Sequence, residues 1–216
     1  MAKTAIKMVE NLDETQLSNG AEEIIAFERP YTVSVTVEGV APMLLHRWND
    51  EAVAEKAAAK KGSAAKKSDN TESYVYRDED GHICIPAKYL KGAVAGPKGA
   101  AKFRQDPRSP RKSALDLYNA SVIVTTNLAK LNGGVKTWDY LDRQRVVVQR
   151  SGITRERPAF NSGWKATFDI MVTLPQYINP SDLREVLVDA GRLCGLGDYR
   201  PTYGRFGIVN FEILGE

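Results

Sequence analysis

Two segments far apart in the chain alternate strictly between apolar and polar residues, and this pattern limits the fold more than any other feature. In residues 31–38 the apolar members are Tyr31, Val33, Val35 and Val37. In residues 165–174 they are Ala166, Phe168, Ile170, Val172 and Leu174. Because side chains two residues apart in a strand point to the same face, each segment predicts a β-strand with one buried and one solvated face.

Two helices are indicated by apolar spacings of three and four and by their end signals. Residues 181–194 carry an apolar stripe made of Leu183, Val186, Leu187, Ala190, Leu193 and Cys194. Gly195 suits the C-terminal end of this helix. A shorter helix is predicted for residues 87–95, with Pro86 at its first position and Gly96-Pro97 at its end.

Two further strands complete the pattern, over residues 121–126 and 208–214. In the last strand we expect Val209, Phe211 and Ile213 to be buried. The elements then follow one another as strand, helix, strand, strand, helix, strand. This order predicts the α+β class with a ferredoxin-like or RRM-like βαββαβ core.

The rest of the chain is assigned to an arm and two insertions. Residues 1–27 are mixed and polar, and we expect a flexible N-terminal arm. Residues 28–216 are expected to form a single domain, with insertions at about 41–85 and 127–164.

The insertions carry weaker signals of their own. The first is predicted to hold a helix over residues 48–60, a flexible lysine-rich loop over 60–70 and a hairpin of strands 74–76 and 83–85. A short strand over residues 145–149 is predicted in the second.

Composition narrows the class of protein. The two cysteines, Cys84 and Cys194, lie far apart without a CxxC motif, so we expect no zinc site and favour two buried thiols over a disulfide. No segment approaches the roughly 20 apolar residues of a membrane-spanning helix. We therefore expect a soluble, cytoplasmic protein without a metal or cofactor, and we interpret the acidic residues Asp78, Glu79 and Asp80 as a hairpin turn.

Basic residues are concentrated in one part of the chain. Residues 82–113 contain eight lysines and arginines and a single acid, Asp106, although the whole chain has a net charge of only +3. The remainder is therefore net acidic. Such segregation is typical of a surface that binds phosphates, although a solvated basic loop would look the same.

Two other clusters have the composition of a nucleic-acid interface. Residues 143–157 contain five arginines, which suit planar contacts to phosphates and bases, with salt bridges to Asp142 and Glu156 as the structural alternative. Residues 195–207 contain four glycines, two arginines and three aromatic residues. Glycines there could expose backbone N–H groups to phosphates and aromatic rings could stack on bases, unless these rings pack on the core.

Three segments resemble the RAMP superfamily, especially the backbone subunits that coat guide RNA in CRISPR effector complexes. Residues 33–45 (VSVTVEGVAPMLL) are similar to the first strand of the family and its spL motif, residues 83–93 (ICIPAKYLKGA) to the motif IPgsslKGalR, and residues 195–207 to the glycine-rich loop. The chain departs from this pattern at Ala87, where glycine is usual, and at Val94-Ala95, where an arginine is expected. Residues 154–158 (TRERP), Trp164 and residues 195–201 also resemble a group of phage-borne proteins.

The resemblance implies an RNA-binding subunit that polymerises head to tail along a guide strand, alone or with other effector subunits, in antiviral defence or in a phage. The insertion 127–164 would then be a thumb that presses between nucleotides. The residues expected to contact the strand are Lys88, Lys91, Lys98, Lys102, Arg104, Arg143, Arg145, Arg150, Arg155, Arg157, Tyr199, Arg200, Tyr203, Arg205 and Phe206.

Three alternatives remain open. One is a phage protein that binds or anneals single-stranded DNA, although RNA is the favoured partner. Another is a metal-independent RAMP-type endoribonuclease that uses His46 as a general base, but no recognised catalytic motif accompanies this histidine, and we expect no enzymatic activity. The last is an assembly protein that binds no nucleic acid.

Overall fold

The structure is a computed structural model of the chain, and it describes residues 29–47, 58, 70–148 and 151–214. The arm expected over residues 1–27 lies outside the described residues. So do nearly all of the helix expected over 48–60 and of the lysine-rich loop that follows it. Among the described residues, no helix is long and apolar enough to cross a membrane.

A four-stranded antiparallel sheet forms the centre of the molecule. β1 (Tyr31–Gly39) lies between β12 (Phe206–Leu214) and β11 (Lys165–Val172), and β7 (Val122–Val124) pairs with the other side of β11. The four core strands therefore stand in the order fourth, first, third, second. This is the order of a ferredoxin-like βαββαβ core, and it confirms the predicted fold class.

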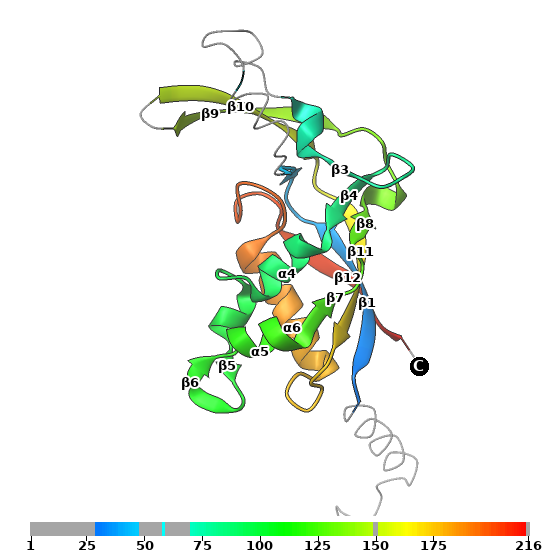
Figure 1. Cartoon of the computed structure of the whole chain (residues 1–216), viewed down its shortest axis with the longest axis vertical. Helices are drawn as coiled ribbons and strands as arrows, with labels where there is room; N and C mark the ends of the chain where they lie inside the picture. Colours follow the sequence, from blue (N-terminus) through cyan, green and yellow to red (C-terminus); the bar gives the residue numbers. More distant parts are fainter. Residues whose placement is uncertain (1–28, 48–57, 59–69, 149–150, 215–216) are drawn as a thin grey trace, which may run out of the picture.

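Helices cover one face of this sheet and leave the other face open (Figure 1). The helical layer contains α4 (Ala87–Ala95), α5 (Leu115–Ser121) and α6 (Pro180–Asp189). Alternate residues of β1 and β11 are buried against it, as their sequence patterns predict. The largest fully buried side chains include Trp164, Phe160, Phe168, Leu90 and Leu117.

The last strand departs from its predicted pattern. A bulge interrupts the pairing of β12 with β1, so that Asn210 pairs with Thr36 and Ile208 with Val37, and Val209 is the extra residue. The bulge turns Val209 to the open face, where it is 52% exposed. Ile213 is also exposed, at the outer edge of the sheet. The predicted burial of Val209 and Ile213 is therefore wrong, while Phe211 packs partly against the core.

The long C-terminal helix is also modified at its end. α6 is followed by a π-helical turn, η4 (Ala190–Cys194), in which the Gly195 N–H donates to the Ala190 carbonyl. This turn changes the phase of the apolar stripe, so Leu193 is exposed although the 3.6-residue period predicts its burial. Pro86, expected at the first helical position, instead ends a strand and caps α4.

The inserted segments build smaller sheets beside the core. One combines β2 (Met43–Leu44), β10 (Ser151–Phe160) and β9 (Tyr140–Val148), and another combines β3 (Tyr76–Arg77), β4 (Ile83–Pro86) and β8 (Leu128–Lys130). The strand predicted over 145–149 is thus the end of a much longer one. The predicted hairpin forms through β3 and β4, but Tyr74 belongs to a 3-10 turn, η1 (Thr71–Tyr74).

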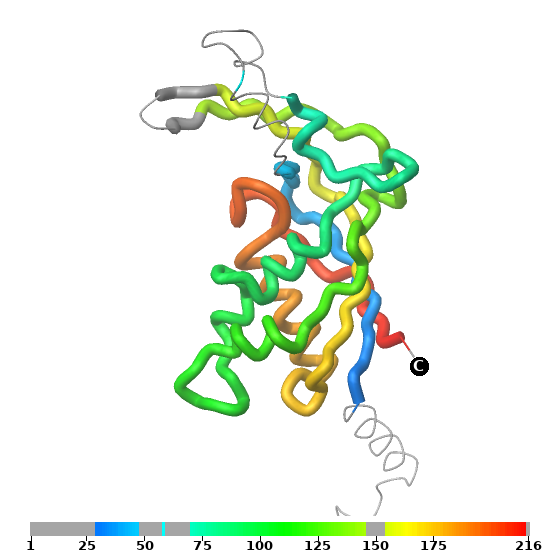
Figure 2. Tube along the Cα trace, in the orientation of Figure 1, coloured from blue at the N-terminus to red at the C-terminus, as the bar shows by residue number. Residues whose placement is uncertain are grey.

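Two hairpins stand out from the core. β9 and β10 form one that projects from the end of the sandwich (Figures 1 and 2). β5 (Gln105–Asp106) and β6 (Ser109–Ser113) form the other, which follows the short helix η2 (Ala100–Phe103). Another short helix, η3 (Leu131–Gly133), follows β8.

Candidate nucleic-acid interface

The open face of the sheet is acidic, and the described strand residues on it offer no stacking surface. The residues that share this face through the strand pairing include Glu38, Asp169 and Glu212, against one ammonium group, Lys165. Among the described strand residues, this face carries no aromatic side chain. RRM-like readers use aromatic residues on the sheet to stack bases. We therefore place the candidate interface on the helical side, where the basic residues of the chain lie.

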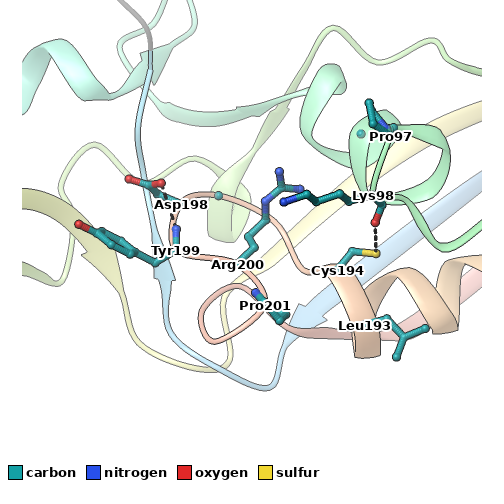
Figure 3. Close-up of a pocket in the computed structure, with 11 residues that line it drawn as sticks. Pro97, Lys98, Leu193, Cys194, Asp198, Tyr199, Arg200 and Pro201 are labelled. Carbon is teal, nitrogen blue, oxygen red and sulfur yellow. Dashed lines mark hydrogen bonds between the residues drawn. The ribbon is translucent and has the colours of Figure 1, made fainter. Parts of the chain in front are cut away.

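A pocket of about 610 Å³ joins two of the basic segments identified from the sequence. It lies between the C-terminal half of α4 and the loop that follows η4 (Figure 3). The lining residues are Gly92, Gly96, Pro97, Lys98, Leu193, Cys194, Gly197, Asp198, Tyr199, Arg200 and Pro201. Segments about a hundred residues apart in sequence thus form one concave surface.

Two cations face each other across this pocket. Figure 3 shows the side chains of Lys98 and Arg200 reaching toward one another from opposite walls, while Asp198 points away. Both side chains are exposed. Among the described residues neither has an acidic partner, and the guanidinium of Arg200 donates only a long bond of 3.3 Å to the Gly195 carbonyl. The pocket therefore has the charge and donors to bind an anion such as a phosphodiester.

Gly92 opens the floor of this pocket. It lies inside α4, where glycine is less favourable than alanine by roughly 1 kcal/mol. Among the described residues, a Cβ atom at this position would meet nothing within 4 Å, so no contact with them requires a glycine. The missing side chain leaves space that a ligand could use.

The glycines of the loop that follows η4 serve the turn itself. Gly204 has a φ of 74°, and a Cβ atom there would collide with the Leu196 carbonyl. The Gly195 and Gly204 N–H groups donate to the carbonyls of Ala190 and Pro42. The expectation that these glycines offer backbone donors to phosphates is therefore wrong at both positions.

An aromatic platform with two cations lies at the N-terminal end of α4. The Arg47 guanidinium carbon and the Lys88 ammonium lie 5.3 and 5.1 Å from the centre of the Tyr76 ring. The ring of Tyr89 meets Tyr76 edge-on at 6.0 Å, and its hydroxyl donates to the His46 carbonyl. Burial raises the pKa of Tyr89 well above its usual range, and the nearby Arg200 opposes this shift. Tyr89 thus ties the Tyr76 platform to the backbone at His46.

The platform was only partly evident from the sequence. Lys88 was predicted as a phosphate ligand, whereas Arg47 and Tyr76 were not assigned to the site. The signal for Tyr76 was available, because the predicted hairpin brings this strand beside the segment that leads into α4. No sequence pattern pointed to Arg47.

Several predicted phosphate ligands instead stabilise the fold. The Lys91 ammonium donates to the carbonyls of Tyr118, Asn119 and Val122, and its burial lowers its pKa. All three N–H donors of the ammonium are thus bound to carbonyls at the end of α5, so Lys91 cannot act as a phosphate ligand in this arrangement. Arg104 is bound by Asp189 at 2.7 Å and Glu185 at 3.0 Å, and these bonds bridge η2 to α6.

Arg157 is buried beneath the hairpin. It is 5% exposed, donates to Asp198 at 3.0 Å and stacks on Tyr74 at 4.5 Å. The Asp198 N–H also donates to the Leu44 carbonyl. Arg157 therefore fixes the base of the hairpin to the loop and is not available to a strand, contrary to the prediction.

The other arginines of residues 143–157 differ in their surroundings. Arg143 pairs with Glu156 at 2.7 Å, which is the predicted structural alternative. Arg145 is exposed and Arg155 is half-buried, and no ion pair involves either of them among the described residues. Arg150 lies outside the described residues.

The aromatic residues of the loop fall into two groups. Phe206 is 2% exposed and belongs to the core, so its predicted stacking role is wrong. Tyr199 and Tyr203 are half-buried, with ring centres 6.4 Å apart, and the Tyr203 hydroxyl accepts a hydrogen bond from Gln144 of β9. Arg205 is exposed and donates to the Pro201 carbonyl.

Two other candidate sites, at His46 and at the acidic turn, make contacts within the chain that account for their residues. His46 packs on the Tyr74 ring at 5.1 Å and lies 3.8 Å from Asp198. Asp78, Asp80 and His82 are close enough to share an ion, but the Lys130 ammonium lies 3.2 Å from Asp78. Although burial opposes it, hydrogen bonds from His82 and Lys130 hold the pKa of Asp78 well below its usual range. Asp78 of this acidic turn is thus already bound by its own neighbours.

Comparison with known proteins finds only distant similarity. No protein-family model matches the chain, and no curated protein matches it. Solved structures that match include a chain of the cryo-EM structure of the Type III-B Cmr-beta bound to cognate target RNA. That chain is 11% identical, the TM-score is 0.45, and the match covers 95% of this chain and 68% of the other. It is a distant structural neighbour.

Proposed function

We propose that this protein binds single-stranded nucleic acid, RNA in preference to DNA, along the helical side of the molecule. The path runs from the Tyr76 platform over α4 to the pocket between Lys98 and Arg200. The observation that carries the proposal is Gly92, a glycine inside α4 whose absent side chain would contact none of the described residues, lining a pocket in which Lys98 and Arg200 have no acidic partner among the described residues.

The chemistry of the path fits a strand rather than a small metabolite. Lys98 and Arg200 can hold a phosphodiester between them, and Lys88 and Arg47 over the Tyr76 ring place positive charge and an aromatic side chain along the same path. An ordered single strand repeats a phosphate and a base at short intervals. The spatial succession of an aromatic platform and a cationic pocket matches this repeat.

We further propose that copies of the protein coat a nucleic-acid strand. Copies of the protein would stack head to tail along a guide RNA or another single strand, each covering a fixed number of nucleotides. The sequence resemblance of residues 83–93 to the RAMP motif supports this, and so does the projecting β9–β10 hairpin, which can reach beyond its own core (Figure 1).

Substitution of Gly92 tests the proposed site. Gly92→Ala should raise the free energy of unfolding by roughly 0.5–1 kcal/mol, because alanine favours the helix. The same change, and more strongly Gly92→Leu, should weaken binding of a fluorescent single-stranded RNA measured by anisotropy. On an RNA too short for two copies, Gly207→Ala is the control, because a Cβ atom there also meets nothing within 4 Å and Gly207 does not line this pocket. Unchanged affinity in Gly92→Leu would contradict the proposal.

The preference for RNA is tested by comparing RNA and DNA strands of the same sequence. A protein that contacts the ribose 2′-hydroxyl distinguishes them. Equal affinity would instead favour the alternative function, a single-stranded DNA binding or annealing protein.

We propose a binding role rather than catalysis for the His46 region. A general base must reach the hydroxyl that it deprotonates, and this ring is packed on Tyr74 and shares Asp198 with Arg157. Incubation with labelled RNA in EDTA tests this. Cleavage that disappears in His46→Ala would establish the endoribonuclease instead.

A further inference from the structure

The two faces of the sandwich carry opposite charge. The open face of the sheet presents Glu38, Asp169 and Glu212 with one compensating Lys165. The opposite side presents exposed Lys102, Arg111 and Lys112 on η2 and β6; among the described residues none of these three forms an ion pair within 4 Å, and Lys112 contributes to the lowered pKa of Asp106. A molecule with one acidic and one basic face attracts its own copies face to back.

Each face also exposes apolar surface, which is a single side chain on the helical side and a hollow on the open face. Phe103, at the end of η2, is 69% exposed, which is unusual for so large an apolar side chain. On the open face, a hollow of about 440 Å³ is flanked by Val40 and Val209, which are 68% and 52% exposed. Gly39, Gly163 and Gly207 line the same hollow, so it contains few side-chain atoms.

The two features lie on opposite sides of the molecule. η2 packs against α4, α5 and α6 and so belongs to the helical layer. The hollow belongs to the other face, because Glu38 and Gly207 pair on that side and the bulge turns Val209 toward it. A contact between Phe103 and the hollow can therefore form only between two different copies. Once it has formed, one Phe103 and one hollow remain free to bind further copies.

We propose that Phe103 of one copy seats in the Val40–Val209 hollow of the next, with Lys102 facing the acidic residues of that sheet. This contact is the head-to-tail interface of the coating function proposed above and rests on it. A second copy fits this hollow better than nucleic acid does, because the surrounding carboxylates repel phosphates.

Two capping variants test the interface. Phe103→Asp removes the projecting ring and keeps the hollow, whereas Val209→Asp spoils the hollow and keeps the ring. Both positions are exposed, so both variants should keep the thermal midpoint of the unsubstituted protein. Ile123→Asp is the matched control, since Ile123 is 42% exposed on the same face but lies on β7, the opposite edge of the sheet.

Assembly is measured by light scattering and mass photometry on a long single-stranded RNA. Each capping variant alone should associate roughly tenfold to a hundredfold more weakly, as expected for the loss of one buried aromatic contact. Mixed together, the two variants should load the long RNA in isolated pairs rather than in longer cooperative runs, because only one intact ring and one intact hollow remain per pair. Ile123→Asp should assemble normally.

Binding of an RNA too short for two copies separates this inference from the proposed function. Both capping variants should bind it as the unsubstituted protein does. If they do, but still load long RNA as cooperatively as the unsubstituted protein, the interface is wrong and the binding function stands. If the unsubstituted protein binds no RNA, the proposed function itself fails.

Discussion

At the scale of single residues, side chains of the same type have different structural roles that the sequence does not distinguish. Lys91 and Lys98 both belong to the basic segment, yet one binds three carbonyls of the chain and the other faces an open pocket. Phe206 and Arg157 resembled ligand contacts in the sequence but are buried. Their partners come from segments far away in the chain, and local composition cannot reveal them.

Paired substitutions of these lysines should separate stability from binding. Lys91→Met leaves carbonyls at the end of α5 without their donor and should lower the free energy of unfolding by roughly 1–3 kcal/mol. Lys98→Met should leave stability nearly unchanged and weaken RNA binding. Urea denaturation and fluorescence anisotropy measure the two effects. If Lys91→Met were as stable as the unsubstituted protein but bound RNA poorly, Lys91 would be a phosphate ligand after all.

At the scale of elements, regular periodicity predicted the core well and the insertions poorly. β1, β11 and α4 follow their patterns closely, because each has one face buried along its whole length. β12 and the end of α6 depart from theirs because a bulge and a π-helical turn shift the phase, and neither has a sequence signature of its own. The hairpin of β9 and β10 was found only in part, since it projects from the core and lacks a continuous buried face.

A shortened hairpin should weaken binding and leave the core folded. Gln144 pairs with Arg155, so residues 145–154 can be replaced by Asn-Gly, which favours a tight two-residue turn. This change keeps the Arg157–Asp198 ion pair. The thermal midpoint should stay close to that of the unsubstituted protein, whereas affinity for RNA and assembly on it should both fall. Retained assembly would show that the hairpin has no part in coating the strand.

A deletion that also removes Arg157 is the informative comparison. It should destabilise the protein, because Asp198 then loses its partner and the loop that follows η4 loses its anchor to β10. Loss of binding in that longer deletion would therefore not by itself identify a contact with the strand.

At the scale of the whole molecule, the chain is a ferredoxin-like sandwich with segregated charge. The open sheet face is acidic, and the helical side holds the platform and the pocket. The fold class followed from the order of the periodic segments. The side on which a nucleic-acid strand would bind could not be predicted from that order, because the sequence shows that charges are clustered but not which face of the sheet they reach.

The salt dependence of RNA binding tests the central claim most directly. For a single strand, each neutralised phosphate contributes about 0.7 to the slope of log affinity against log salt concentration. If Lys98 and Arg200 hold phosphates, replacing both with methionine should reduce the magnitude of this slope by about 1.4. Exchange of Lys136 and Arg184 for methionine serves as the control, because both are exposed cations outside the pocket and outside the surfaces proposed for self-association. A slope that is unchanged without Lys98 and Arg200 would contradict the account.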